Sequence, residues 1–364
     1  MRRRAFAALL IAVAAVVGTP AGAQSPTPSS RPDGGPGITA GSAILVTLNN
    51  GEGRVLFGRR VHDMRAPASL TKVVTALVAR DIYKLDDVVV ASPLVLQSHG
   101  SDLNLEPGMK ITVRNLLYAL LLKSANDAGM ALAANDPFGF DHFVRLMNQK
   151  ARSLGARDTH FNNPHGLDMI GHVSSAWDMA LFTRELLSDP VLADIVKTKT
   201  HRMPWKDGRQ RIFDNHNKLV LERSDIVGVK TGFTANAGHC LIAAVRTADG
   251  IAFSVVMGSQ DHYRDSTALL DYAKTIELRV GSGGGGVDIG RSLSAPPAQL
   301  SETQTAASAI PGLDPGDDAR WLVVMVVLAL LTLATIGSRR RSHPLRDAAD
   351  VLAWVEPFVP PDKP

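Results

Sequence analysis

A serine and a lysine three residues apart are the first residues in the sequence that can perform chemistry together. Ser69 and Lys72 stand in the segment SLTK, which leads into apolar residues at helical spacing. Positions i and i+3 of a helix share one face, so hydroxyl and amine lie about one turn apart. A serine hydroxyl becomes nucleophilic when a base takes its proton, and a lysine of depressed pKa can be that base. Backbone N–H groups at the helix start can stabilise an oxyanion beside Ser69.

A second motif, Ser-Ala-Asn at residues 124–126, interrupts an apolar helical stretch. Ser124 can pass a proton between Lys72 and a leaving amine, while the Asn126 side chain offers an amide to hold a substrate or the lysine. Taken alone, Ser124 would be interpreted as a helix cap. The functional interpretation depends on its place along the chain, after the serine and lysine and before a third motif.

The third motif, Lys230-Thr231-Gly232, lies in a predicted strand. Lys230 and Thr231 supply a cation and a hydroxyl suited to a terminal carboxylate, and the Lys230 charge can also depress the pKa of Lys72. Gly232 has no side chain, so a peptide substrate can lie against the strand edge. The backbone N–H of Phe233 is then the natural second oxyanion donor. Together the three motifs predict an enzyme with a serine nucleophile.

The apolar pattern around these motifs changes its period repeatedly. Helical spacing predicts helices at residues 69–83, 113–122, 127–134, 176–187 and 266–276. Short apolar runs bounded by turn residues predict strands at residues 44–46, 55–57, 88–91, 226–230, 240–246 and 251–257. Strands at both ends and helices in the middle predict an α+β fold, in which the first hairpin and the last strands share one antiparallel sheet flanked by helices.

Both chain ends carry apolar runs outside this core. An arginine cluster, an apolar run and a small-residue ending are typical of a secretory signal peptide, and an uncharged run after Arg320 predicts a transmembrane helix. The predicted organisation is a signal peptide (1–23), a disordered spacer (24–40), a catalytic domain (41–280), a flexible Gly/Ala/Ser/Pro linker (281–319), the transmembrane helix (320–337) and a cytoplasmic tail (338–364).

Charge and composition set the compartment. An arginine triplet at residues 339–341 predicts, by the positive-inside rule, a single-pass membrane protein whose catalytic domain lies outside the cytoplasm.

The chain has 364 residues, 45% of them hydrophobic, enough for one large domain or two ordinary ones. Cys240 is the single cysteine, which excludes an intramolecular disulfide framework. The net charge of +4 comes largely from the terminal arginines, so no nucleic-acid partner is predicted, and no cofactor either.

The sequence around the motifs resembles one family. The segments PASLTKVVTALVA, LLLKSANDAGMALA, LGARDTHFNNPHGLD, VSSAWDMALFTRELL and VGVKTGFTANAGHCLIAAV are similar to those of the D-alanyl-D-alanine carboxypeptidases, the low-molecular-weight penicillin-binding proteins. The resemblance covers about residues 41–274. It implies a fold like that of the β-lactamases and DD-peptidases, with peptidoglycan stem peptides ending in D-Ala-D-Ala as substrates and β-lactams as covalent inhibitors.

The resemblance also implies roles for single residues. Ser69 would be the acyl-ester nucleophile, Lys72 the proton acceptor, Ser124 a second catalytic residue and Lys230 a substrate-binding residue. Family members tend to carry an arginine after the last core strand that binds the substrate carboxylate. Arg264 is the candidate here, although the loop that precedes it is shorter than usual and the chain has a glycine-rich linker in place of a β-rich second domain.

Other functions remain open at this point. A class A β-lactamase needs a glutamate to activate the deacylating water, and residues 155–175 contain none. A non-catalytic sensor of wall peptides or β-lactams would be expected to lack Ser69, Lys72 or Ser124, all of which are present. The sequence does not separate a carboxypeptidase from an endopeptidase that cleaves crosslinks. The remaining alternative is a metalloenzyme, on a sequence cluster that lacks an HExxH motif: His160, His165, His172 and Asp168.

Overall fold

The computed structural model describes residues 35–281 and 292–293, and its centre is an antiparallel sheet. The strand order is β2-β1-β9-β8-β7, so β7 is an edge strand with β8 on one side only. The strands are β1 (Ser42–Asn49), β2 (Glu52–Arg59), β7 (Ile226–Thr234), β8 (Gly238–Arg246) and β9 (Ile251–Ser259). The first hairpin and the last strands therefore share one sheet, as the sequence predicts.

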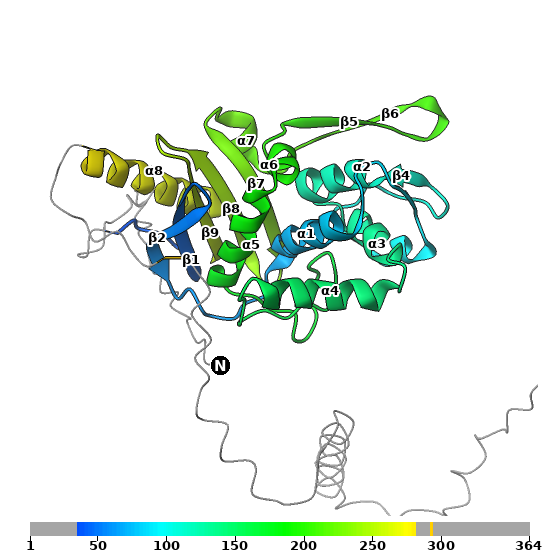
Figure 1. Ribbon diagram of the computed structural model, residues 1–364, viewed down its shortest axis with the longest axis horizontal. Helices are drawn as coiled ribbons and strands as arrows, with labels where there is room; N and C mark the ends of the chain where they lie inside the picture. The colour runs from blue at the N-terminus through cyan, green and yellow to red at the C-terminus, as the bar shows by residue number, and fades with distance from the viewer. Residues whose placement is uncertain (1–34, 282–291, 294–364) are drawn as a thin grey trace, which may run out of the picture. The chain divides into compact units, whose positions relative to one another are not determined.

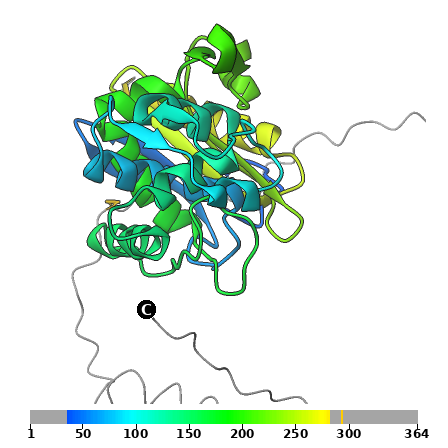
Figure 2. The ribbon, with the colours of Figure 1, turned by 90° about the vertical axis from the view of Figure 1, so that its right-hand side faces the viewer.

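Each face of the sheet is covered by helices, because both faces are apolar. On one face, Leu241 and Ala243 of β8 pack with Leu269 and Leu270 of α8 (His262–Gly281). On the other face, alternate residues of the same strands join the larger core beneath α1 and α5. Figure 1 shows α8 on one side of the sheet and the remaining long helices on the other, and Figure 2 views the molecule from that helix-rich side. Strand alternation thus produces a three-layer arrangement.

The helix-rich side is built from short elements. Its helices are η1 (Ala68–Thr71), α1 (Lys72–Ile82), η2 (Pro93–Gln97), α2 (Val113–Tyr118), η3 (Ala119–Lys123), α3 (Asn126–Ala134), α4 (Phe140–Ser153), α5 (Ala176–Ser188), α6 (Pro190–Val196) and η4 (Lys206–Gly208). Helix α7 (Lys218–Glu222) belongs to the α8 face instead, because its Leu219 and Val220 join the apolar cluster beneath α8. Its strands form two small antiparallel pairs, β3 (Val88–Val90) with β4 (Lys110–Thr112) and β5 (Thr200–Pro204) with β6 (Gln210–Asp214). The β5–β6 hairpin extends beyond the helices in Figure 1.

Two predicted helices differ from the structure at the motifs. Ser69 lies in the 3-10 turn η1, which starts at Ala68 with a φ of 48°, and the α-helix begins only at Lys72. The predicted helix at 113–122 is α2 followed by the π-helical turn η3, which ends at Ser124. Strand β7 runs on to Thr234, four residues past the predicted end, so the whole third motif and Phe233 are in the sheet.

The folded body reaches beyond the predicted catalytic domain at both ends. Thr39 donates hydrogen bonds from its N–H and hydroxyl to Asp265, and Ala40 is fully buried. Leu293 is also buried, and its N–H donates to the Gly53 carbonyl at 2.7 Å. Within the described residues, no helix is both long and apolar enough to span a bilayer. The predicted signal peptide, transmembrane helix and cytoplasmic tail lie outside those residues.

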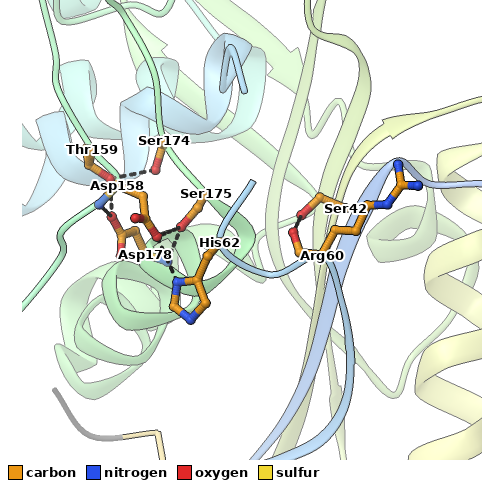
Figure 3. Close-up of polar contacts among 8 residues, drawn as sticks. All are labelled: Ser42, Arg60, His62, Asp158, Thr159, Ser174, Ser175 and Asp178. Atoms are coloured by element: carbon orange, nitrogen blue, oxygen red, sulfur yellow. Dashed lines mark hydrogen bonds and ion pairs between the residues drawn. The ribbon is translucent and has the colours of Figure 1, made fainter. Parts of the chain in front are cut away.

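A polar network ties the loop of residues 158–175 to its surroundings (Figure 3). Asp158 Oδ2 accepts from the Ser175 hydroxyl at 3.0 Å and lies 2.8 Å from His62 Nδ1. Asp178 Oδ2 accepts from the Asp158 N–H and from the Thr159 hydroxyl, both at 2.7 Å. Serine, histidine and aspartate meet here but do not form a catalytic triad. Ser175 Oγ accepts from the Asp178 N–H at the start of α5 and donates to Asp158. His62 also contacts Asp158, so no base faces the Ser175 hydroxyl. The network anchors the loop.

Candidate active site

The nucleophile and its base meet at the junction of η1 and α1. Lys72 Nζ lies 2.8 Å from Ser69 Oγ, within hydrogen-bond distance. Lys72 is fully buried, whereas Ser69 is half-buried and open to a substrate. This is the arrangement of an activated serine, in which the base is held away from water and the hydroxyl is accessible.

The other contacts of Lys72 define the state of its amine. Its Nζ donates to Asn126 Oδ1 at 2.7 Å and to the His165 carbonyl at 2.5 Å. A neutral amine has two N–H donors and one lone pair, so these two acceptors leave the lone pair for the Ser69 proton. Burial, and secondarily the charge of Lys230, lowers the pKa of Lys72 well below its usual value. The contacts accommodate a neutral lysine, and the lowered pKa favours the form that can act as a base.

Ser124 and Asn126 are placed by a break in the helix. The π-helical turn η3 ends at Ser124, whose φ of 63° and ψ of 31° are left-handed, and α3 then begins at Asn126. Such strain in a non-glycine residue is concentrated at functional sites. Asn126 Nδ2 donates to the His99 carbonyl at 2.5 Å while its Oδ1 receives Lys72. The Asn126 amide orients the lysine, and both residues of the motif are buried.

The third motif is the edge strand that faces the nucleophile. A Cβ on Gly232 would lie 3.2 Å from the Ser69 nitrogen, so the strand backbone passes directly against η1. Phe233 is the next residue of the strand, and its N–H stays the predicted second oxyanion donor. Lys230 is buried, and its Nζ donates to the Thr231 carbonyl at 2.8 Å. Desolvation lowers the pKa of Lys230 to about 7, so an arriving carboxylate would restore a full charge there.

The loop of residues 158–175 supports the nucleophile from behind. Gly166 has a φ of +89°, and a Cβ there would lie 1.9 Å from the Ala68 carbonyl oxygen. The Asn162 N–H donates to His172 Nδ1 at 3.0 Å, which leaves the proton on Nε2, 2.9 Å from the Thr71 hydroxyl. That hydroxyl donates in turn to the Ala68 carbonyl at 2.8 Å. A continuous hydrogen-bond chain thus fixes the residue preceding Ser69.

Comparison with known proteins decides the family. The profile of the D-alanyl-D-alanine carboxypeptidases (Peptidase_S11) matches residues 27–261. This chain belongs to the Peptidase_S11 family. The assignment agrees with the three motifs and with the antiparallel sheet between helices.

Particular S11 proteins and neighbours are similar over the same part of the chain. D-alanyl-D-alanine carboxypeptidase DacF of Bacillus subtilis is 34% identical over 242 residues, 64% of this chain and 62% of DacF. A D-alanyl-D-alanine endopeptidase of Pseudomonas aeruginosa is 31% identical over 245 residues, 65% of this chain and 78% of that protein. The crystal structure of the Streptomyces K15 DD-transpeptidase has a TM-score of 0.62 and 28% identity, covering 66% of this chain and 99% of that one. The chain therefore spans under two thirds of DacF.

The structure distinguishes among the other predicted residues. Arg264 lies in the first turn of α8, where its N–H donates to Asp261, and no described residue forms an ion pair with its side chain. Its role in binding a carboxylate stays a prediction.

Among residues 35–281 and 292–293, no group of histidine, cysteine and acidic side chains could hold a metal ion. His172 is engaged by Thr71, and Asp168 accepts from the Thr234 hydroxyl at 2.8 Å.

Proposed function

We propose that this S11 protein is a serine D-alanyl-D-alanine carboxypeptidase that removes the terminal D-alanine from peptidoglycan stem pentapeptides. The observation that carries the proposal is the buried Lys72 amine 2.8 Å from the Ser69 hydroxyl. Substrate carboxylates would lie beside Lys230 and Thr231 at the edge of β7. The family and the carboxypeptidase relatives support the same reaction.

The reaction proceeds through an acyl-enzyme. Ser69 Oγ attacks the carbonyl carbon of the penultimate D-alanine as its proton moves to the Lys72 lone pair. The carbonyl oxygen becomes an oxyanion and is stabilised by the N–H groups of Ser69 and Phe233. The C–N bond then breaks, and Ser124 passes the proton to the leaving amine. Water next attacks the ester, giving its proton back through Lys72 to Ser69 Oγ and releasing the shortened peptide.

Release of D-alanine from a pentapeptide ending in D-Ala-D-Ala tests the proposal. Ser69→Ala removes the attacking oxygen, so turnover should fall by roughly three orders of magnitude or more. Ser188→Ala, an exposed serine at the end of α5, is the matched control and should retain full activity. If Ser69→Ala still releases D-alanine at the wild-type rate, the assignment of the nucleophile is wrong.

We also propose that β-lactams acylate Ser69 and leave slowly. The described loop at 155–175 has no glutamate to activate a deacylating water, and the carbonyl of His165 occupies a position next to Lys72. Intact-protein mass spectrometry should therefore detect a persistent penicilloyl adduct. Turnover of nitrocefin as fast as the peptidase reaction would identify a β-lactamase instead.

An endopeptidase is the second candidate, since one relative carries that name. The two activities differ in whether the leaving group is free D-alanine or a crosslinked peptide, and both need the same serine chemistry. Mass spectrometry of muropeptides digested by the purified protein separates them. Loss of D-alanine from pentapeptides supports the carboxypeptidase, and conversion of crosslinked dimers to monomers supports the endopeptidase.

We further propose that the protein is exported and held in the membrane by residues 320–337, with the active site outside the cytoplasm. The uncharged apolar run and the arginine triplet after it support this topology. The full chain should stay in the membrane pellet after carbonate extraction. A chain that ends at residue 319 should be released, and retention of both forms would argue against this anchor.

A further inference from the structure

His216 stands on an unusually well-fixed turn. The two asparagines that flank it are buried, and Asn215 Nδ2 donates to the carbonyls of Val196 and Thr198 at 3.1 and 3.0 Å. The Asn217 N–H donates back to Asn215 Oδ1 at 2.9 Å. The His216 carbonyl itself accepts from the Tyr263 hydroxyl at 3.1 Å. The backbone is therefore held from several elements, while the His216 side chain is exposed.

The turn joins the two motifs that face Ser69. The His216 N–H donates to the Leu122 carbonyl at 2.8 Å, two residues before Ser124. Asn217 Nδ2 donates to the Gly228 carbonyl at 3.0 Å, two residues before Lys230. His216 is thus fixed between the second and third motifs. An exposed side chain on a rigid support at such a position is typical of a residue that contacts a ligand.

The charges that shift the pKa of His216 are positive. Partial desolvation lowers its pKa to about 4, and nearby positive charges contribute to that shift. They come from Lys230 on β7 and Lys123 at the end of η3, and Lys72 contributes only in its protonated form. A neutral imidazole in this field keeps one N–H donor, and the field attracts an anion. The surface between the motifs is therefore suited to a carboxylate.

We propose that His216 binds the terminal carboxylate of the substrate through a ring N–H, next to Lys230 and Thr231. The inference rests on the proposed acyl-transfer function and names a residue that selects its substrate. The sequence alone offered Arg264 for this task. His216 differs from it in being fixed by contacts to the segments that carry Ser124 and Lys230.

Thioester substrates test this inference without requiring D-alanine release. An N-acyl-D-alanyl thioglycolate carries a carboxylate in the leaving group, and its thioglycolamide counterpart is neutral at that position. Both have a reactive leaving group, so Ser69-dependent hydrolysis is measurable for each. His216→Ala should lower kcat/KM about tenfold for the thioglycolate, the expected loss of one hydrogen bond to a charged group, and less than twofold for the thioglycolamide.

Three variants of the full chain control the measurement. His216→Gln retains an N–H donor and should recover part of the thioglycolate activity. His142→Gln removes an imidazole of α4 that pairs with Asp136 and should leave the ratio of the two substrates unchanged. Arg264→Gln tests the competing candidate, because a selective loss of thioglycolate activity there would assign the carboxylate to Arg264.

Equal losses for both thioesters in His216→Ala would show a merely structural role and overturn the inference. Selective loss in Arg264→Gln with none in His216→Ala would overturn it as well. A wild-type protein that hydrolyses thioesters but releases no D-alanine would instead refute the proposed carboxypeptidase function, and the comparison of the two thioesters would still stand.

Discussion

The loop behind Ser69 and the outer end of β7 in front of it differ in how many of their groups are already hydrogen-bonded or packed within the protein. Behind the nucleophile, the Pro164 carbonyl accepts a hydrogen bond from the Thr75 hydroxyl, and the next carbonyl in the chain accepts one from Lys72. Gly166 lies in contact with Ala68. In front, Phe233 is 60% exposed at the end of its strand, and His216 is exposed on its fixed turn. The rear is complete without a substrate, whereas the front has polar and apolar groups free to meet one.

This difference separates chemistry from recognition. The position and charge of the Lys72 amine must be settled before substrate arrives, because reorganisation during reaction would raise the barrier. At the front, neighbouring rings support the end of β7, but the Phe233 ring is not fully covered. The Phe233 ring packs at a tilt against His239, with 4.6 Å between centroids. His239 stacks on His262 at 4.8 Å, and His262 packs at a tilt against Tyr263 at 4.2 Å. This row holds the end of β7 while leaving the Phe233 ring accessible.

The strongest test of the rear is Gly166→Ala. The new Cβ would lie 1.9 Å from the Ala68 oxygen at a φ that alanine rarely adopts, so the residue before Ser69 must move. We expect loss of most peptidase activity together with a fall in the free energy of unfolding of about 2 kcal/mol or more. Initial rates and urea unfolding measure the two effects.

Gly171→Ala is the matched control for this change. It has a similar φ of +79° in the same loop, but its nearest neighbour would be Asn162 Nδ2 at 3.7 Å. The conformational cost should therefore be shared by both variants, and only Gly166→Ala should lose activity. If the two variants behave alike, contact with Ala68 is not what makes the rear of the site rigid.

The sequence predicts the rear of the site better than the front. Ser69, Lys72 and Asn126 can be named from short motifs, since local spacing places Lys72 and Asn126 at the first residues of α1 and α3 and Ser69 in the turn before α1. The sequence also predicts the main sheet, because its strands have strong apolar runs between turn residues. Helix α4 was missed, even though Phe143, Met147 and Ala151 follow a helical period and are all buried.

What sequence reasoning missed depends on contacts between distant segments. Ala68 has a positive φ at the start of η1, and its carbonyl lies against Gly166, which is almost 100 residues away in the chain. His216 belongs to no recognisable motif, and its position depends on Leu122, Gly228 and Tyr263. The flanking asparagines were the available signal, since Asn-x-Asn before a short apolar run is typical of a capped turn.

A smaller effect connects the front of the site to the rear. The Lys230 charge is the second cause, after burial, that lowers the pKa of Lys72. Only the neutral amine accepts the Ser69 proton, so acylation should increase as the pH rises through the pKa of Lys72. Lys230→Met removes the charge, which makes the ammonium form of Lys72 less unfavourable and raises its pKa. The acid limb of the rate of penicillin acylation should then move to higher pH.

The absolute rate will also fall in Lys230→Met if a β-lactam carboxylate binds at Lys230, so the informative quantity is the position of the limb and not its height. Lys218→Met, at the exposed start of α7, removes an equal charge that does not contribute to the Lys72 shift and should leave the limb in place. A limb that stays fixed or moves to lower pH in Lys230→Met would mean that burial alone sets the lysine base. In that case the front of the site would act on the substrate only, and the separation between chemistry and recognition would be complete.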